Sequence, residues 1–302
     1  MRQLLSMVAL GLLCAAPVTA QAKVNIFACE PEWAALAEEI GGDNVAAFSA
    51  THAKQDPHHI RARPSLIAKA RHADLILCSG AGLEVGWLPL LIQKAGGHVQ
   101  PGSVGYLMAS EYVPILEKPI VVDRSMGDVH PEGNPHIHLN PHNILLVARE
   151  LTKRLETIDR PHAGSYQSKL NEFISRWQPA IARWENNALP LKNLPVVVHH
   201  RGFSYFLDWL ELRQVASLEP KPGIPPTTSH LEELLQQLKA KPASMIIRTP
   251  YEPKEASEWL SERIDRPAVV LPYTIGGDDE SDNLFKLFDR SMSLLLGAVD
   301  DQ

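Results

Sequence analysis

Short apolar runs alternate with amphipathic stretches along the chain from residue 23 onward. Runs rich in Val, Ile and Ala are typical of buried strands, whereas apolar positions spaced by three and four residues are typical of amphipathic helices. Because strand and helix patterns alternate in the first half, they favour a parallel sheet with helical crossovers. The predicted strands are 24–29, 45–50, 74–78 and a segment within 104–113, and the predicted helices are 32–40, 64–72 and 82–95.

A long helical pattern separates this half from a second alternating set. Apolar and aromatic side chains recur every three or four residues from Pro161 to Trp184, which predicts a helix long enough to span a domain. Pro179 within it predicts a kink. Ser229 and Glu232 form a capping-box pattern at the start of a later helix. The other predicted elements are strands at 194–198, 243–247 and 268–271 and helices at 144–157, 203–210, 231–238, 254–264 and 282–296.

The two halves share one plan. We therefore predict an α/β fold of two similar lobes, each a parallel sheet with flanking helices, joined by a long linker helix. The predicted boundaries are 1–22 for a signal peptide, 23–159 for an N-terminal lobe, 160–190 for the linker helix and 191–302 for a C-terminal lobe. A mature chain of about 280 residues also exceeds what one compact core usually holds, which favours two domains.

The first 22 residues have the pattern of a cleavable export signal. Arg2 precedes an apolar run, and small residues follow up to Ala20 and Ala22, either of which fits as the cleavage position. The run is too short for a permanent bilayer span. Leu13, before Cys14, is too bulky for a lipoprotein-processing site. We therefore expect export as a soluble protein.

Charge and cysteine content narrow the class of protein. Removing 1–22 leaves 28 basic against 35 acidic side chains, a formal charge of −7, which argues against nucleic acid as a partner. Two cysteines remain, Cys29 and Cys78, each at the end of a predicted strand. In an oxidising compartment adjacent parallel strands would bring them into a disulfide. Two buried thiols that never meet are the alternative.

Histidines gather in the segment 128–143. Its four imidazoles, those of His130, His136, His138 and His142, are interrupted by prolines that prevent a regular helix. Imidazole is a common ligand of borderline-soft divalent ions, so the cluster predicts metal binding. In an extended segment His136 and His138, two residues apart, would point to the same face. A polar surface loop is the alternative for any single one of the four.

A second group of histidines, His52, His58 and His59, follows the predicted strand at 45–50. In parallel sheets ligands collect at the carboxyl ends of the strands, where this loop begins. The loop is therefore another candidate for metal ligands.

Four short motifs along the mature chain share one resemblance. They are Asp56-Pro57-His58 followed by Pro64-Ser65, NPHIHLNP at 134–141, VHHRGFSYF at 198–206 and DNLF at 282–285. Together they resemble the motifs of the metal-specific periplasmic solute-binding proteins of ABC transporters, in particular the zinc-binding branch. The resemblance covers essentially the whole mature chain. It departs from the family pattern at His138, where an aromatic residue is usual, and at Arg201, where the family has Asp.

The resemblance implies metal ligands at His58, His136, His200 and Asp282, two from each lobe. Three neutral imidazoles and one carboxylate make a four-coordinate site suited to Zn²⁺, whereas Mn²⁺ favours more oxygen ligands. The implied function is high-affinity capture of Zn²⁺ in the periplasm and delivery to an inner-membrane ABC permease with its ATPase. The resemblance further implies a monomer, a periplasmic zinc chaperone as a second partner, and no enzymatic activity.

The surplus histidines leave alternatives open. His130, His138 and His142 are predicted to form a weaker secondary metal site, the alternative being a solvated loop. A secreted zinc hydrolase would hold the ion with His136, His138 and His200 and leave the fourth position to water. The sequence contains no H-E-x-x-H helix and no nucleophile elbow, which argues against that class. Binding of manganese or another divalent metal, and a periplasmic zinc buffer, are the remaining alternatives.

Overall fold

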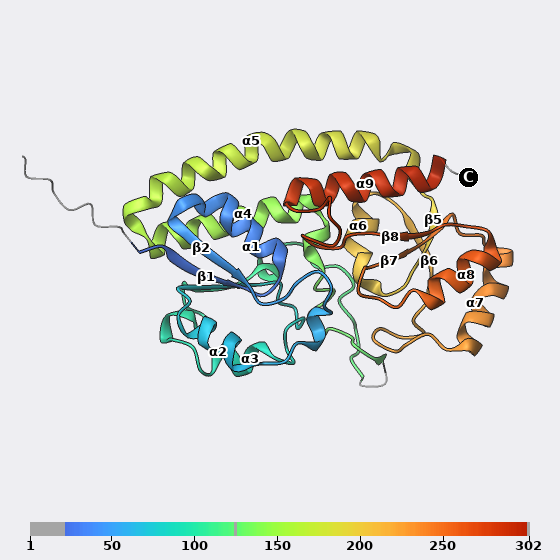
Figure 1. Ribbon diagram of the computed structural model, residues 1–302, viewed down its shortest axis with the longest axis horizontal. Helices are drawn as coiled ribbons and strands as arrows, with labels where there is room; N and C mark the ends of the chain where they lie inside the picture. The colour runs from blue at the N-terminus through green and yellow to red at the C-terminus, as the bar shows by residue number, and fades with distance from the viewer. Residues whose placement is uncertain (1–21, 124–125, 301–302) are drawn as a thin grey trace, which may run out of the picture.

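Two parallel sheets of four strands each form the framework of the protein (Figure 1). The computed structural model describes residues 22–123 and 126–300. The predicted signal peptide 1–22 therefore lies, apart from Ala22, outside the described residues. No helix in those two ranges combines the length and the apolar composition needed to cross a bilayer.

The two sheets have the same strand order. The N-terminal sheet runs β2-β1-β3-β4 and the C-terminal sheet β6-β5-β7-β8, with every pair parallel. Their strands are β1 Val24–Ala28, β2 Val45–Ser49, β3 Leu75–Cys78, β4 Tyr106–Met108, β5 Pro195–Val198, β6 Arg213–Ser217, β7 Met245–Arg248 and β8 Ala268–Val270. The predicted fold class, two similar α/β lobes with a long helix, is confirmed.

Helices cover both faces of each sheet. They are α1 Pro31–Gly41, α2 Pro64–Arg71, α3 Leu88–Ile92, α4 Pro141–Ile158, α5 Ala163–Asn187, α6 Ser204–Trp209, α7 Thr228–Ala240, α8 Glu255–Ile264 and α9 Leu284–Asp300. Helices α2 and α3 pack on the outer face of the N-terminal sheet, and α7 and α8 on that of the C-terminal sheet. The inner faces of the two sheets share one continuous hydrophobic core, to which α1, α4, α5, α6 and α9 contribute.

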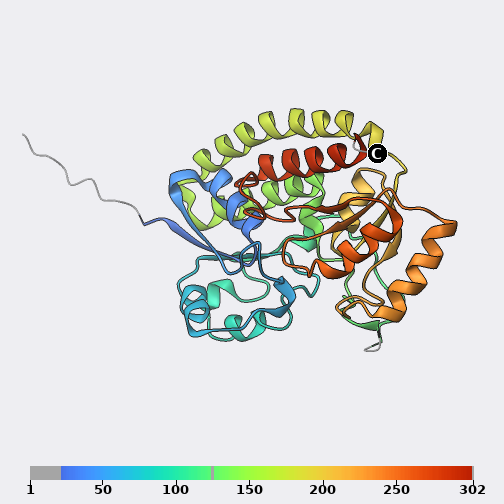
Figure 2. The same cartoon turned by 45° about the vertical axis from the view of Figure 1, so that its right-hand side comes forward.

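The long helix α5 ties the two lobes together. Figures 1 and 2 show it as one gently curved helix that runs above both sheets beside α9, and it continues unbroken through Pro179. Its buried Trp177 donates a hydrogen bond to the carbonyl of Pro141 at the start of α4, and Trp184 donates to Asp289 of α9. Because the same core touches both sheets, separating the lobes would expose apolar side chains to water.

Several predicted elements differ in extent from those observed. The predicted helix 82–95 is a turn followed by the short helix α3, because Gly80 and Gly82 have positive φ and break the helical pattern. The predicted strand within 104–113 is only β4, followed by a 3-10 turn. Helix α7 is capped by Thr227, whose hydroxyl accepts from the backbone N–H of His230, and not by Ser229. Strand β6 was not predicted, because its polar ends hide the apolar pattern.

The disulfide between Cys29 and Cys78 is formed. Strands β1 and β3 pair in parallel with Ala28 opposite Leu77, so both cysteines stand at the carboxyl edge of the N-terminal sheet. Their Cα atoms are 4.8 Å apart, and both side chains are fully buried. The alternative of two separate thiols is therefore wrong.

Candidate metal centre

His58 lies in the loop that leaves the carboxyl end of β2. Asp56 caps the 3-10 turn Pro57–His59, since its carboxylate accepts from the backbone N–H of His58 at 2.9 Å. The same oxygen lies 2.7 Å from Nδ1 of the His58 ring. This contact places the proton on Nδ1 and leaves the Nε2 lone pair for a metal, an arrangement common among ligating histidines.

His136 is the most deeply buried of the candidate ligands, with 1% of its surface exposed. It immediately precedes the 3-10 turn Ile137–Leu139 and helix α4, whose start is fixed by Asn140 and Pro141. Its backbone N–H donates to the side-chain oxygen of Asn134 at 3.0 Å, and its Nδ1 lies 2.5 Å from the hydroxyl of Tyr273. The backbone of His136 is thus held by the turn before it, and its ring is oriented by Tyr273.

His200 stands two residues beyond the carboxyl end of β5. Its Nδ1 lies 2.7 Å from Oε2 of Glu219, which follows the neighbouring strand β6. All three histidines therefore have Nδ1 engaged by an oxygen of the protein, which leaves each Nε2 without a protein oxygen partner and able to bind a metal.

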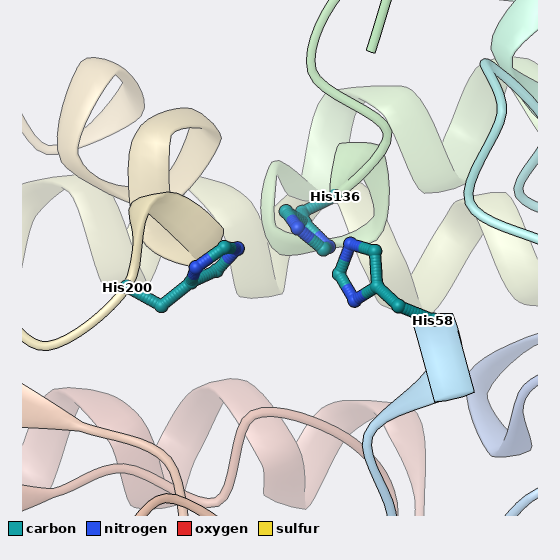
Figure 3. A group of neighbouring side chains, drawn as sticks. All are labelled: His58, His136 and His200. Atoms are coloured by element: carbon teal, nitrogen blue, oxygen red, sulfur yellow. The ribbon is translucent and has the colours of Figure 1, made fainter. Parts of the chain in front are cut away.

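The three rings converge on one point between the lobes (Figure 3). One ring nitrogen from each of His58, His136 and His200 lies within 4.8 Å of the other two. The ring centroids are 5.4 Å apart for His58 and His136 and 5.7 Å for the other two pairs. Three imidazoles at nearly equal separations, with lone pairs directed inward, form three corners of a tetrahedral metal site.

Burial and neighbouring charges set the protonation of these ligands in different directions. Burial, and then the nearby imidazoles of His58 and His200, hold the pKa of His136 well below 6.5. Burial also lowers the pKa of His200, but its hydrogen bond to Glu219 and the charge of that carboxylate outweigh burial, so its pKa is raised. The proton of His200 is therefore the harder of the two for a metal ion to displace near neutral pH.

Asp282 does not join this group, contrary to the sequence-based assignment. Its carboxylate is exposed and pairs with Lys286 at 2.6 Å, one turn further along the start of α9. Across the described ranges, no carboxylate or thiolate completes the three-histidine group. The side chain that reaches the site from the segment between β8 and α9 is Tyr273. Burial raises the pKa of its phenol well above 10, so it stays a neutral hydrogen-bonding partner of His136.

The predicted secondary site of His130, His138 and His142 is not assembled. His142 is exposed on α4 and pairs with Glu185 at 2.8 Å. His138 is buried, and its Nε2 lies 3.0 Å from the carbonyl of Tyr273. The hydrolase arrangement is not assembled either, because His138 contacts the Tyr273 carbonyl and Glu32 and is not grouped with His136 and His200. Only His130 lies at the three-histidine site, with its ring centroid 5.2 Å from that of His58.

Sequence reasoning missed the residues that orient the ligands. Asp56 stands in the quoted motif before His58 but received no role, although Asp before Pro is a common start of a capped turn. Tyr273 follows the predicted strand β8, so its place at the carboxyl end of a parallel strand could have marked it as a site residue. Glu219 holds the same kind of position after β6, but that strand was not predicted.

Comparisons with known proteins identify the family of the chain. Residues 26–296 match the family described as ZnuA, zinc-uptake complex component A, periplasmic. The metal ABC transporter substrate-binding lipoprotein ScbA of Streptococcus cristatus is 26% identical over 193 residues, which are 62% of this chain and 59% of that protein. The manganese ABC transporter substrate-binding lipoprotein PsaA of Streptococcus pneumoniae serotype 4 is 24% identical over 193 residues, 62% of this chain and 60% of that protein. The chain thus spans about three fifths of the length of these relatives.

Solved structures show the same fold. The crystal structure of ZnuA superposes with a TM-score of 0.75 at 21% identity and covers 92% of this chain and 100% of its own. A Cd-bound periplasmic metal binding protein from Candidatus Liberibacter asiaticus gives a TM-score of 0.74 at 14% identity, with the same coverage. The family comprises solute-binding transport proteins and not enzymes. Since the family match extends over most of the chain, this protein belongs to the ZnuA family of metal-binding solute-binding proteins of ABC transporters.

Proposed function

We propose that this protein captures Zn²⁺ in the periplasm and delivers it to an inner-membrane ABC permease with its ATPase. The observation that carries the proposal is the convergence of His58, His136 and His200, each with Nδ1 fixed by an oxygen and Nε2 directed at a common point. Tight binding follows from this preorganisation, since all three rings are held by protein oxygens before the ion arrives. The ion is the cargo and takes part in no reaction.

The ligand chemistry supports zinc over manganese. Imidazole nitrogen suits Zn²⁺, whereas Mn²⁺ is best held by carboxylate, carbonyl and water oxygens. The nearest carboxylates, Asp56 and Glu219, are engaged with the Nδ1 atoms behind the rings. Relatives named for manganese exist in this family, so the metal preference of this chain is an inference from its own donor atoms. Copper and nickel also bind imidazole well, so the competition titration includes Cu²⁺.

The lobes act as two halves of a metal clamp in this proposal. We propose that the lobes are residues 23–159 and 191–302 and that the linker helix is 160–190. The protein acts as a monomer after removal of residues 1–22. It can receive zinc from a periplasmic chaperone. His58 and His136 belong to the first lobe and His200 to the second. Because the lobes share one core beneath α5 and α9, we expect a small change between the free and the loaded states, confined to loops.

Metal analysis and competition test the proposal. Protein purified without chelator is assayed for bound metal and then titrated with Zn²⁺, Mn²⁺ and Cu²⁺ in competition. We expect one equivalent of zinc, a strong preference over manganese, and loss of at least about a thousandfold in affinity for His136→Ala. The matched control is His142→Ala, since His142 is an exposed histidine outside the site. Equal losses in the two variants, or tighter binding of manganese than of zinc, would refute the proposal.

A further inference from the structure

A fourth histidine faces the three-histidine site from a different segment. Nε2 of His130 lies 3.2 Å from Nε2 of His58. Two ligand nitrogens on one tetrahedral zinc ion, with bonds of about 2.0–2.1 Å, stand roughly 3.3 Å apart. The observed separation is close to that of two ligands sharing one ion. His130 stands outside the group whose nitrogens all lie within 4.8 Å of one another, so its ring must move toward His136 and His200 to share the ion.

Both facing nitrogens can present a lone pair to an ion. His58 holds its proton on Nδ1 against Asp56. The Nδ1 atom of His130 lies against the backbone of Gly82, where an added Cβ would stand 3.4 Å away. Two lone pairs at 3.2 Å repel one another unless a cation or a shared proton lies between them.

The backbone around His130 is anchored at both ends on the C-terminal lobe. After His130, the carbonyl of Asn134 accepts a hydrogen bond from the Tyr205 hydroxyl, which also accepts from the N–H of Leu116. Before His130, the N–H of Asp128 donates to the carbonyl of Pro222 at 2.8 Å. These contacts hold His130 at the site without any contribution from its own ring. The ring is thus free to serve as a ligand.

The position of His130 also makes it the ligand on the solvent side. A cavity of about 590 Å³ opens between the lobes, and its wall includes His130, His136 and His200. His136 closes the inner end, since only 1% of its surface is exposed, whereas His130 is half-buried. An ion that enters through this cavity meets His130 on its way to the inner ligands.

We propose that His130 is the fourth ligand of the bound ion, completing an all-nitrogen site with His58, His136 and His200. The inference rests on the proposed zinc-binding function and assigns the position that Asp282 was expected to fill. Four imidazoles without a coordinating oxygen disfavour Mn²⁺. His130 therefore strengthens the preference for zinc that the other three imidazoles already give.

The test compares His130→Ala, His130→Asp and the control His142→Ala in the full mature protein. His142 belongs to the same histidine-rich segment but is 54% exposed and pairs with Glu185. Zinc affinity is measured by chelator competition, and the ligand set by the visible absorption of the Co²⁺-loaded protein. Thermal melting of the metal-free variants controls for folding.

We expect His130→Ala to weaken zinc binding by about tenfold to a thousandfold and to change the Co²⁺ spectrum as water replaces imidazole. His130→Asp should narrow the zinc-to-manganese affinity ratio, and His142→Ala should match the wild type. A His130→Ala variant with wild-type affinity and an unaltered Co²⁺ spectrum would overturn this inference while leaving the three-histidine site intact. Retention of full affinity by His136→Ala would instead overturn the proposed function itself.

Discussion

Glu219 Oε2 lies 2.7 Å from Nδ1 of His200 and also accepts a hydrogen bond from the backbone N–H of Gly223 at 2.9 Å. The carboxylate is thus held in place by the chain that follows β6 while it orients a ligand that follows β5. A carboxylate behind a ligating imidazole makes the ring a better donor to the metal.

Replacing Glu219 by Gln should weaken zinc binding at pH 8 by about tenfold to a hundredfold. The amide oxygen can still accept the Nδ1 proton, so the ring keeps its orientation but loses the negative charge behind it. Chelator competition measures the change. Glu185→Gln is the matched control, because Glu185 pairs with the exposed His142 outside the site. Equal affinities of the two variants would show that the charge of Glu219 does not matter.

The affinity for zinc should fall less steeply with decreasing pH than it would at a site of three histidines with unshifted pKa values. Metal binding requires neutral imidazole, so a proton competes only near and below the pKa of its ring. The pKa of His200 is raised, and competition there begins above pH 6.5 as the pH falls. The pKa of His136 is well below 6.5 and that of His130 is about 4, mainly through burial, so both stay neutral at mildly acidic pH.

Competition titrations between pH 8 and pH 5 test this expectation. We expect affinity to begin falling in the near-neutral range with a slope below three protons per ion. In Glu219→Gln the onset should move to lower pH, because the carboxylate no longer raises the pKa of His200. A slope of three in the wild type would contradict the protonation states inferred from the site.

Replacing Tyr273 by Phe should lower zinc affinity by about tenfold. The change removes the hydroxyl that lies 2.5 Å from Nδ1 of the buried His136 and leaves that nitrogen without its partner. Tyr112→Phe is the control, since the hydroxyl of Tyr112 contacts Arg154 away from the site. If both variants bind zinc as the wild type does, Tyr273 does not orient His136.

Removing the disulfide should destabilise the metal-free protein by about 4 kcal/mol, because the bond closes a loop between residues 49 apart in the chain. The variant is Cys29→Ala with Cys78→Ala, and urea unfolding gives the free energy. Reductant should lower the wild-type stability toward that of the double variant and leave the variant unaffected. A wild-type midpoint equal to that of the variant would rule out a stabilising role.

The metal-free protein should lose stability as the pH rises from 5 to 8, and replacing Glu84 by Gln should make this loss smaller. Burial raises the pKa of Glu84 from 4.5 to about 7. A raised pKa in the folded state gives stability that is present below 4.5 and lost as the pH rises through about 7. Between pH 5 and pH 8 the melting temperature of the variant should fall by a few degrees less than that of the wild type. Exposed Glu262 provides the control Glu262→Gln, and identical pH profiles for both variants would contradict the expectation.

The sequence by itself determined the fold class and predicted three histidines that the structure brings together. Alternating strand and helix patterns specify two parallel sheets, and a loop at the carboxyl end of a parallel strand must lie at that edge of the sheet. His58 lies in the loop after β2, His200 stands two residues after β5, and His136 precedes α4. The strand pattern placed these loops at the sheet edges, and the resemblance of the surrounding motifs singled out the three histidines within them. The sequence left the disulfide open, because the strand patterns place Cys29 and Cys78 at strand ends but only the sheet order makes those strands neighbours.

The tertiary structure alone decided what surrounds those ligands. Asp282 was assigned from its place in a motif, but an exposed Lys286 one turn away offers its carboxylate a nearer partner than the buried site does. Glu219 and His130 reach the site through contacts between segments 19 and 72 residues away from the ligands they face. Such contacts depend on how the lobes pack against each other beneath α5. Side-chain periodicity specifies which face of an element is buried, but not which distant loop comes to lie against it.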